Sequence, residues 1–383
     1  MRSILATAVI CCACGRIDFD ARPAHDAGVE PSLDGFAGCV PVGTFAAGIR
    51  YPANLNPGSL VVGDVDGDQV PDVLVSNLLS NTVSVLHNRG DATFDAPVSY
   101  GVGNTPLGIA LGDLDGTGTP DLVVANLNGN TVGVLLNTGS GTFGAQVEYP
   151  APGGPYAIAV ADLDHAGGID VVTADYSGNT VGLFHNLGGT LSAQATIPVG
   201  VNPISIVAGD LDGDGFVDVV VSNYNSNAIS VLSGTATGLA GAVTFSSGGQ
   251  PWGLGLGKLD ADASRDVVVA NSQDNTISAF RNDGNNGLGI GQTIALGMSP
   301  RAIALGDLDG DGIDDLVAAS FGSNELIVRR GGSAGFGAPE PYATLDMTPN
   351  TVVIVDLDRD GAPDLVTTNV GGSSITVFRG SCR

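Results

Sequence analysis

The sequence predicts an all-β protein, a seven-bladed β-propeller with four-stranded antiparallel blades. A nine-residue segment rich in aspartate and glycine occurs seven times, starting at residues 64, 113, 162, 210, 258, 307 and 356, at steps of 48 or 49 residues. A period of this length is typical of proteins built from repeated structural units. No stretch has helical periodicity, and seven all-β units favour a closed ring over an open stack, which would leave two apolar ends. We refer to the seven segments as acidic loops 1 to 7, in chain order.

Each repeat contains four short strands, with an acidic loop between two of them. In the second repeat we predict strands at residues 94–100, 107–112, 122–125 and 131–136. The second and third are apolar runs, which indicates burial on both faces. The fourth carries β-branched residues, which favour strands. A blade of this kind must stack on its neighbours, because it cannot bury both faces alone.

The two ends of the chain predict how the ring closes. Residues 45–51 are the counterpart of residues 94–100, but they precede the first acidic loop. Residues 374–379 are the counterpart of residues 131–136, and no outer strand follows them. We therefore expect the N-terminal strand to complete the last blade.

Composition limits the class of protein. The chain has 383 residues and a net charge of −26, and 25 of its 40 acidic residues are the aspartates at positions 1, 3, 5 and 9 of the acidic loops. No basic run exists, which argues against a nucleic-acid partner. Length alone would suggest two or three domains, but the unbroken repeat predicts a single one over residues 39–383. We expect a monomer.

The N-terminus resembles an export signal over residues 1–13. Arg2 supplies a positive start, and residues 4–12 form an apolar run that is too short to span a bilayer. Ala13, Cys14 and Gly15 resemble the cleavage site of a bacterial lipoprotein, in which a lipid on Cys14 would attach the protein to a membrane. An ordinary secretory signal is the alternative, because Cys11 stands where such sites usually carry leucine. Residues 14–38 predict a flexible tether. We expect an exported protein, either an outer-membrane or cell-surface lipoprotein or a secreted protein.

If Cys11, Cys12 and Cys14 belong to the leader, two cysteines remain, Cys39 and Cys382, one at each end of the repeat region. Disulfides persist in exported proteins. Closure by the N-terminal strand would bring the two cysteines together, where every other blade has a hairpin. We therefore predict a disulfide between them; two unpaired thiols are the alternative.

The acidic loops have the composition of a site for a hard cation. Aspartates at positions 1, 3, 5 and 9 offer carboxylates, position 7 a backbone carbonyl, and glycine at position 6 a sharp bend. Such a concentration of like charges would be costly unless a cation neutralised it, so we expect several structural calcium ions; hydrogen-bonded turns without metal are the alternative. The predicted ligands are Asp64, Asp66, Asp68 and Asp72 in loop 1; Asp113, Asp115, Thr117 and Asp121 in loop 2; Asp210, Asp212, Asp214, the Phe216 carbonyl and Asp218 in loop 4; Asp307, Asp309, Asp311, the Ile313 carbonyl and Asp315 in loop 6; and Asp356, Asp358, Asp360 and Asp364 in loop 7.

Acidic loops 3 and 5 depart from this pattern. Ala166 removes the position-5 ligand of loop 3, and Lys258 replaces the first aspartate of loop 5. We expect both to bind metal weakly or not at all. In loop 5, Lys258 is expected to take the place of the metal as counter-ion to Asp260, Asp262 and Asp266.

These residues resemble the FG-GAP or VCBS repeat proteins, whose best-known fold is the seven-bladed propeller of integrin α-subunits. Residues 336–339, Phe-Gly-Ala-Pro, match the signature that names the family, and residues 94–97 are a variant of it. The resemblance covers residues 45–379. It implies calcium in the loop between the first and second strands of a blade, and surface roles in adhesion or ligand capture.

A partner is expected at the end of the ring opposite the acidic loops. A proline recurs seven residues before each loop, and the residue after this proline varies from blade to blade. A second variable position lies in the turn between the third and fourth strands of each repeat. Aromatic and arginine side chains in these two positions are typical of binding interfaces. Side chains that only shield the strand ends are the alternative. The predicted partner-binding residues are Tyr156, Tyr176, Tyr224, Trp252, Arg301 and Phe321.

The function that the sequence favours is a binding or adhesion module for a protein or glycan, not an enzyme. His87 and His185 occupy one register near exposed strand ends, and no serine stands in a nucleophile elbow. A lyase or hydrolase that acts on a polysaccharide, or a structural envelope protein without a ligand, are the alternatives.

Overall fold

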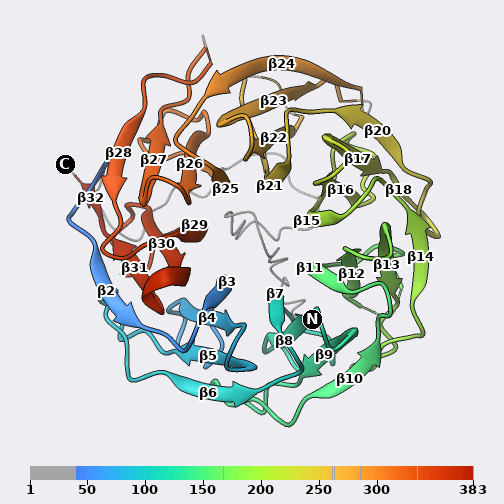
Figure 1. Ribbon diagram of the computed structural model, residues 1–383. Coiled ribbons are helices and arrows are strands. Elements are labelled where there is room, and N and C mark those ends of the chain that lie inside the picture. The colour runs from blue at the N-terminus through green and yellow to red at the C-terminus, as the bar shows by residue number, and fades with distance from the viewer. Residues whose placement is uncertain are drawn as a thin grey trace, which may run out of the picture.

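In the computed structural model the chain forms a ring of seven blades around a central axis (Figure 1). The structure describes residues 40–166, 168–260, 262, 264–284, 287–333 and 335–382. The predicted export signal (1–13), the tether (14–38) and Cys39 lie outside the described residues. No helix among the described residues is long and apolar enough to cross a membrane.

Each blade is a four-stranded antiparallel sheet, so the predicted fold class is confirmed. From the axis outward, blades 1 to 3 contain β3 (Pro57–Gly63), β4 (Asp72–Asn77), β5 (Thr82–Leu86) and β6 (Val98–Gly101); β7 (Pro106–Gly112), β8 (Asp121–Asn126), β9 (Thr131–Leu135) and β10 (Val147–Pro150); and β11 (Pro155–Ala161), β12 (Asp170–Asp175), β13 (Thr180–Phe184) and β14 (Ala195–Pro198).

Blades 4 to 7 repeat this order. They contain β15 (Pro203–Gly209), β16 (Asp218–Asn223), β17 (Ala228–Leu232) and β20 (Val243–Ser246); β21 (Pro251–Gly257), β22 (Asp266–Asn271), β23 (Thr276–Asn282) and β24 (Leu288–Ala295); β25 (Pro300–Gly306), β26 (Asp315–Ser320), β27 (Glu325–Arg329) and β28 (Glu340–Ala343); and β29 (Pro349–Val355), β30 (Asp364–Asn369), β31 (Ser374–Phe378) and β2 (Ile49–Pro52). Blade 4 also carries a small hairpin, β18 (Gly234–Thr235) with β19 (Gly238–Leu239), and a 3-10 turn, η1 (Val370–Gly372), follows β30.

The core lies between the blades. Seven clusters of buried aliphatic side chains fill the seven spaces between neighbouring blades in the described residues. The cluster that joins the last blade to the first contains Leu60 and Val62 together with Val353 and Val355. The first blade therefore packs on the seventh as it packs on the second, and no apolar end is left exposed.

The N-terminal strand closes the ring, as predicted. β2 pairs with β31, with Tyr51 opposite Ile375, and becomes the outer strand of blade 7. The single strand predicted over residues 45–51 is in fact two, because β1 (Pro41–Phe45) separates from β2 and pairs with β32 (Gly380–Cys382). The predicted strand at residues 94–100 is likewise shorter: β6 starts at Val98, after Pro97, which cannot donate to a ladder.

Candidate functional site

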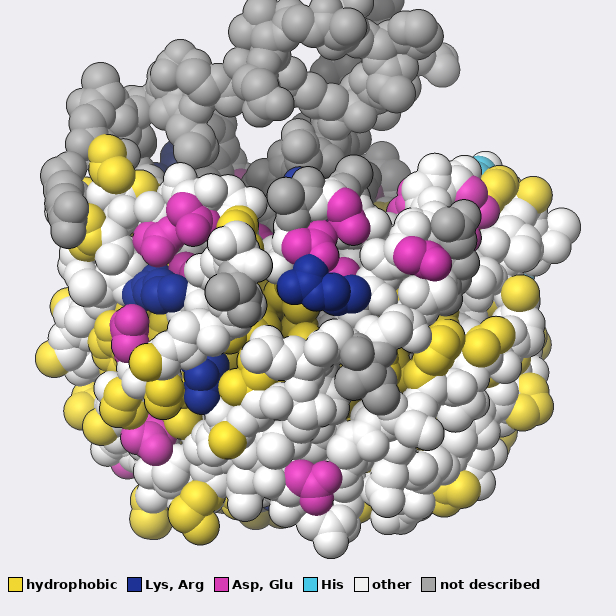
Figure 2. All heavy atoms as spheres, turned by 90° about the horizontal axis from the view of Figure 1, so that it is seen from above, with side chains coloured by type: hydrophobic (Ala, Val, Ile, Leu, Met, Phe, Trp, Pro, Cys, Tyr) yellow, Lys and Arg dark blue, Asp and Glu magenta, His cyan; other side chains and the backbone are white. Residues whose placement is uncertain are grey.

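The acidic loops link the first and second strands of every blade, all at one end of the ring. Figure 2 shows the ring from its side, and most of the acidic side chains on this face gather toward one end. The last aspartate of each loop is the first residue of the second strand and is buried: Asp72, Asp121, Asp170, Asp218, Asp266, Asp315 and Asp364.

Loop 4, one of the two complete copies, shows how these segments fold. The carboxylate of Asp210 accepts hydrogen bonds from the backbone N–H groups of Gly213 (2.7 Å) and Gly215 (3.1 Å). Both glycines have a positive φ, at 76° and 88°, which a residue without a Cβ adopts freely. Loops 1 and 7 reach the same bend with Gln69 (φ 70°) and Arg359 (φ 59°), where a side chain costs conformational energy. The loop backbone thus orients the carboxylates inward.

The ninth position has a role that the sequence analysis did not assign. Asp218 accepts hydrogen bonds from the N–H of Leu211 (2.8 Å) and of Gly234 (2.8 Å), so it ties the loop to the end of the third strand. Burial raises the pKa of this carboxyl group in every blade, to about 6 for Asp121 and to about 7 for Asp364. This aspartate therefore shapes the fold, whether or not it also binds an ion.

Several of these clusters could hold a metal ion. Ligand atoms lie within 4.8 Å of one another in the groups Asp64–Asp66–Asp68, Asp113–Asp115–Asp121 and Asp210–Asp212–Asp218. The donors are carboxylate oxygens, the ligands of hard divalent cations, and they occupy the predicted positions. The residues present therefore fit such an ion.

The prediction for Lys258 is wrong. Its side chain is exposed and makes no ion pair with the loop aspartates among the described residues. Arg281 at the end of β23 instead contacts Asp260 through Nη1. The end of the third strand lies beside the loop, so Arg281 reaches Asp260, whereas the side chain of Lys258 is exposed.

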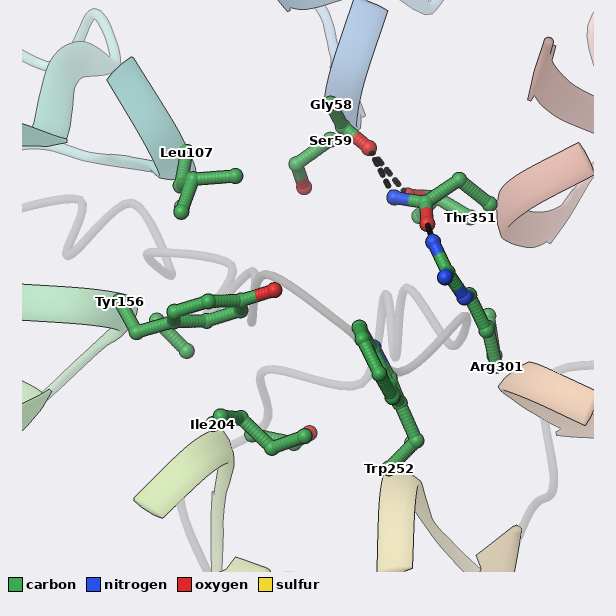
Figure 3. A pocket seen from close by; sticks show the side chains of 14 residues that line it. Gly58, Ser59, Leu107, Tyr156, Ile204, Trp252, Arg301 and Thr351 are labelled. Carbon is green, nitrogen blue, oxygen red and sulfur yellow. Dashed lines mark hydrogen bonds between the residues drawn. The ribbon is translucent and has the colours of Figure 1, made fainter. Parts of the chain in front are cut away.

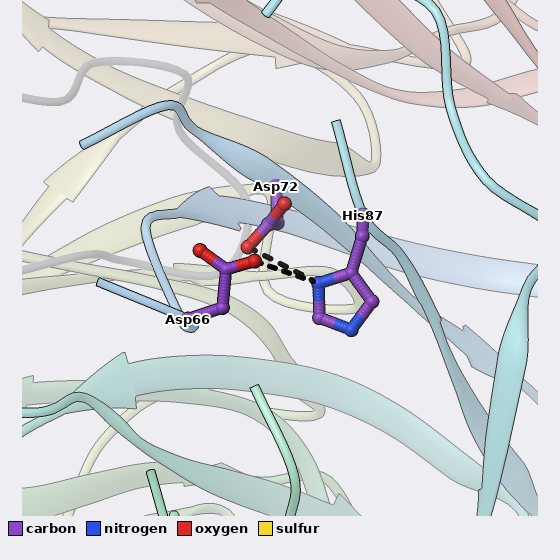
Figure 4. A group of neighbouring side chains, drawn as sticks. All are labelled: Asp66, Asp72 and His87. Atoms are coloured by element: carbon purple, nitrogen blue, oxygen red, sulfur yellow. Dashed lines mark ion pairs between the residues drawn. The ribbon is translucent and has the colours of Figure 1, made fainter. Parts of the chain in front are cut away.

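Arg281 belongs to a register that the sequence analysis missed. The residue 23 positions after the start of each acidic loop is basic in five blades: His87, His185, Arg281, Arg330 and Arg379. His87 lies with Nδ1 3.7 Å from Asp66 and 3.6 Å from Asp72 (Figure 4). His185 Nδ1 lies 2.9 Å from Asp164. The two histidines were expected at exposed strand ends. They are instead half-buried against the loop carboxylates. Their shared position in the repeat was the feature of the sequence that could have revealed this contact. We call this set the basic register.

The opposite end of the ring holds a pocket on the axis. It encloses about 460 Å³, solvent at its mouth included, and each blade contributes the two residues that follow the proline of its first strand. These residues are Gly58, Ser59, Leu107, Gly108, Tyr156, Ala157, Ile204, Ser205, Trp252, Gly253, Arg301, Ala302, Asn350 and Thr351. We call this cavity the axial pocket.

Three of the six predicted partner-binding residues line the axial pocket, namely Tyr156, Trp252 and Arg301 (Figure 3). The guanidinium of Arg301 stacks on the ring of Trp252, 4.3 Å from its centroid, and donates to Asn350 Oδ1 at 3.2 Å. Asn350 in turn donates to the carbonyl of Gly58 (2.7 Å) across the seam between blades 7 and 1.

The other three predicted residues, Tyr176, Tyr224 and Phe321, support the lining from behind. Tyr176 packs on Tyr156, with ring centroids 5.8 Å apart, and Tyr224 packs edge-on against Trp252 at 5.3 Å. Phe321 lies under Arg301, 3.3 Å from the guanidinium carbon. The two predicted positions thus form an inner and an outer layer. Ser205, which was not predicted, also lines the pocket, and its hydroxyl is buried without a hydrogen-bond partner.

Solved structures share the fold at low sequence identity. BBS1N in complex with ARL6DN aligns over 89% of this chain and 97% of its own, with 13% identity and a TM-score of 0.62. Virginiamycin B lyase from Staphylococcus aureus aligns over 88% and 99%, with 15% identity and a TM-score of 0.62. An Agrocybe aegerita lectin that recognises non-reducing terminal N-acetylglucosamine aligns over 97% of both chains, with 16% identity and a TM-score of 0.54. These likenesses bear on the fold alone.

The family is shown by the repeats themselves. No protein of curated function matches the sequence. The model of the FG-GAP-like repeat matches six overlapping segments, residues 64–124, 113–173, 165–221, 210–269, 258–318 and 307–367. Each segment runs from one acidic loop into the second strand of the next blade, so the match follows the structural unit. The chain therefore belongs to the FG-GAP-like repeat family.

Proposed function

We propose that this protein is an exported, calcium-stabilised binding module that holds a protein or glycan partner in the axial pocket. The observation that carries the proposal is the pocket itself, which is concave, lies on the axis and combines aromatic faces with a few polar groups. Such a combination is typical of ligand sites. Trp, Tyr and Arg are also the side chains that contribute most to binding energy at interfaces.

The lining of the axial pocket favours binding over catalysis. It offers the hydroxyls of serine, threonine and tyrosine, one amide and one guanidinium, but no carboxylate, imidazole or thiol. General bases and activated nucleophiles come mostly from those missing groups. The fold itself hosts lyases, lectins and protein-binding propellers, so the argument rests on the residues of the pocket.

Calcium belongs to this proposal as a structural ion. The converging carboxylates of the acidic loops repel one another, and a divalent cation bound there would offset the repulsion. Loops 2 and 4, which have Leu136 and Ser233 in place of a basic side chain, would depend on the ion most. The ions would lie at the end of the ring opposite the axial pocket and would take no part in binding the partner.

A binding screen with a matched pair of variants tests the proposed function. Purified protein is applied to arrays of glycans and of surface proteins, and hits are measured again with Trp252→Ala and Leu79→Ala. Leu79 is 71% exposed, follows β4 at the same end of the ring and does not line the pocket. We expect Trp252→Ala to weaken binding at least about tenfold and Leu79→Ala to leave it unchanged. Equal binding by both variants, with native circular dichroism, would place the partner elsewhere.

A further inference from the structure

Arg301 is a partly buried cation with no anionic partner among the described residues. Its Nε is buried with no hydrogen-bond partner, and among the described residues its side chain donates one hydrogen bond, from Nη1 to the neutral amide of Asn350. Burial lowers the pKa of its guanidinium, and the groups that act on it electrostatically are the phenols of Tyr156 and Tyr224, with no carboxylate among them. Burying a charge without a counter-charge is costly, so such an arrangement calls for a function.

Several other arginines of the chain have carboxylate partners, whereas the buried Arg329 donates to the backbone carbonyls of Gly337 and Ala295. Arg89 lies 2.6 Å from Asp95, Arg330 lies 3.0 Å from Asp315, and Arg50 and Arg281 contact Asp346 and Asp260. In a protein with 40 acidic residues, the axial pocket nevertheless contains none. The pocket therefore places a positive charge where no acidic side chain of the described residues lines the same cavity.

Of the three guanidinium nitrogens of Arg301, only Nη1 makes a hydrogen bond among the described residues. Trp252 and Phe321 contact the guanidinium through ring faces, with centroids 4.3 Å and 3.3 Å from its central carbon. Cation–π contacts of this kind stabilise the charge but use none of the N–H donors, which lie in the guanidinium plane. Two parallel N–H groups in that plane match the two oxygens of a carboxylate.

The rest of the pocket suits a hydroxylated ring. The hydroxyl of Tyr156 points toward the centre of the pocket, facing the side that holds Trp252 and Arg301 (Figure 3). Burial raises the pKa of Tyr156 to about 12, so the phenol stays protonated and can donate. Ser205 adds a buried hydroxyl that has no partner. Neutral donors beside aromatic faces can bind the hydroxyls of a sugar while its C–H face packs on a ring.

We propose that the axial pocket binds a glycan residue that carries a carboxylate, a uronic acid, with the carboxylate on Arg301 and the sugar ring beside Tyr156 and Trp252. This inference rests on the proposed binding function and names the chemical class of its ligand. The carboxylate of the ligand supplies the negative charge that no described residue places beside Arg301.

Calorimetric titration with matched sugars tests the assignment. The probes are trimers of galacturonate, glucuronate and mannuronate, the methyl esters of the same trimers, and a glutamate trimer peptide. We expect at least one uronate to bind at least about tenfold more tightly than its ester, as an ionic hydrogen-bond pair would give. Arg301→Gln should remove that difference and leave ester binding unchanged. Arg89→Gln, which removes a surface guanidinium paired with Asp95, should behave as the native protein.

The possible results separate the inference from the proposed function. If esters and uronates bind equally and Trp252→Ala abolishes both, the carboxylate assignment is overturned while the binding function stands. If the glutamate peptide binds and the sugars do not, the glycan assignment is overturned. No binding of any uronate at millimolar concentration also overturns it. Should Arg301→Gln unfold, Arg301→Lys keeps the charge without the planar fork, and it should retain part of the preference for the acid.

Discussion

Arg330 at the end of blade 6 lies with Nη1 3.0 Å from Oδ2 of Asp315, the last aspartate of acidic loop 6. Burial alone would lower the pKa of Arg330, but the carboxylates of Asp315 and Glu340 together outweigh it and raise that pKa. Loops 4 and 6 share aspartates at positions 1, 3, 5 and 9 and glycines at positions 4 and 6, yet loop 4 has Ser233 where loop 6 has Arg330. Two loops with one motif therefore differ in the charge that surrounds them.

The first prediction concerns competition between the basic register and calcium. Arg330→Gln removes a cation from loop 6, so its calcium affinity should rise about threefold to tenfold, as expected for a partly exposed ion pair worth ~1 kcal/mol. Ser233→Arg should lower the affinity of loop 4 in return. Calcium titration calorimetry of each variant against native protein measures both. Because Arg330 also contacts Gly43 and Glu340, melting curves must show that the variant stays folded. Weaker calcium binding by folded Arg330→Gln would contradict the prediction.

The second prediction concerns removal of calcium from the whole protein. An ion that binds the folded state alone stabilises it by about 2.7 kcal/mol when its concentration is one hundred times the Kd. With several loops contributing, excess EGTA should lower the melting temperature by several degrees, and added calcium should restore it. Magnesium should restore less, because it gives up its waters reluctantly. Superimposable melting curves in EGTA and in calcium would show that the loops fold as turns without an ion.

The sequence was sufficient for the blades and the closure of the ring, and the reason is the repeat. Apolar runs such as residues 107–112 and 122–125 recur in phase with the acidic loops, so a single unit predicts all seven. The repeat region begins with an outer strand that has no repeat before it and ends with a repeat that lacks an outer strand. β2 therefore pairs with β31. Only the strand ends were misjudged, where Pro97 and the break between Phe45 and Ile49 interrupt pairing.

The candidate sites were only partly predictable, because their contacts are tertiary. Position in the repeat correctly placed Trp252 and Arg301 at one end of the ring. It did not reveal that Phe321 lies beneath Arg301, or that Arg281 rather than Lys258 reaches Asp260. Those contacts depend on how the third strand of a blade lies beside its acidic loop. The spacing of 23 residues between the start of a loop and the basic register does not show which way either side chain points. The basic register is nevertheless visible in the sequence when positions are counted from the first residue of each acidic loop, because five of the seven repeats then have a basic residue at the same position.

The third prediction concerns Asp175, which stands at the end of β12 where five other blades have asparagine. Burial raises its pKa to about 6, although Thr173, Thr180 and Gln194 donate hydrogen bonds to the carboxylate. The folded state thus holds the proton more tightly than the unfolded state. Below its unfolded pKa of 3.8, Asp175 is protonated in both states and does not change the free energy of unfolding. As the pH rises from there through about 6, the buried carboxyl group must lose its proton, and the free energy of unfolding falls progressively.

Asp175→Asn should therefore raise the free energy of unfolding at pH 7 by up to about 3 kcal/mol and leave it unchanged near pH 4. Urea unfolding at both pH values measures the difference. The reciprocal variant, Asn126→Asp in blade 2, should lose stability at pH 7 and recover it on acidification. Asn126 is fully buried and donates to Thr131 Oγ1 at 3.1 Å, so it provides a matched site. An equal effect of Asp175→Asn at both pH values would assign it to packing instead of charge.

The last prediction concerns the seam of the ring. β1 pairs with β32, with Pro41 opposite Cys382, and Cys39 precedes Pro41 by two residues in the sequence. The disulfide between Cys39 and Cys382 stays a prediction, and it would close a loop of several hundred residues. In the chain-entropy model Cys382→Ser should lower the free energy of unfolding by about 4–5 kcal/mol. Reduction of the native protein should reproduce that loss in denaturant titrations and leave Cys382→Ser unchanged. Peptide mapping of unreduced protein checks the bond directly: if both thiols react with an alkylating agent, β2 and the packing of blade 1 on blade 7 hold the seam without a covalent link.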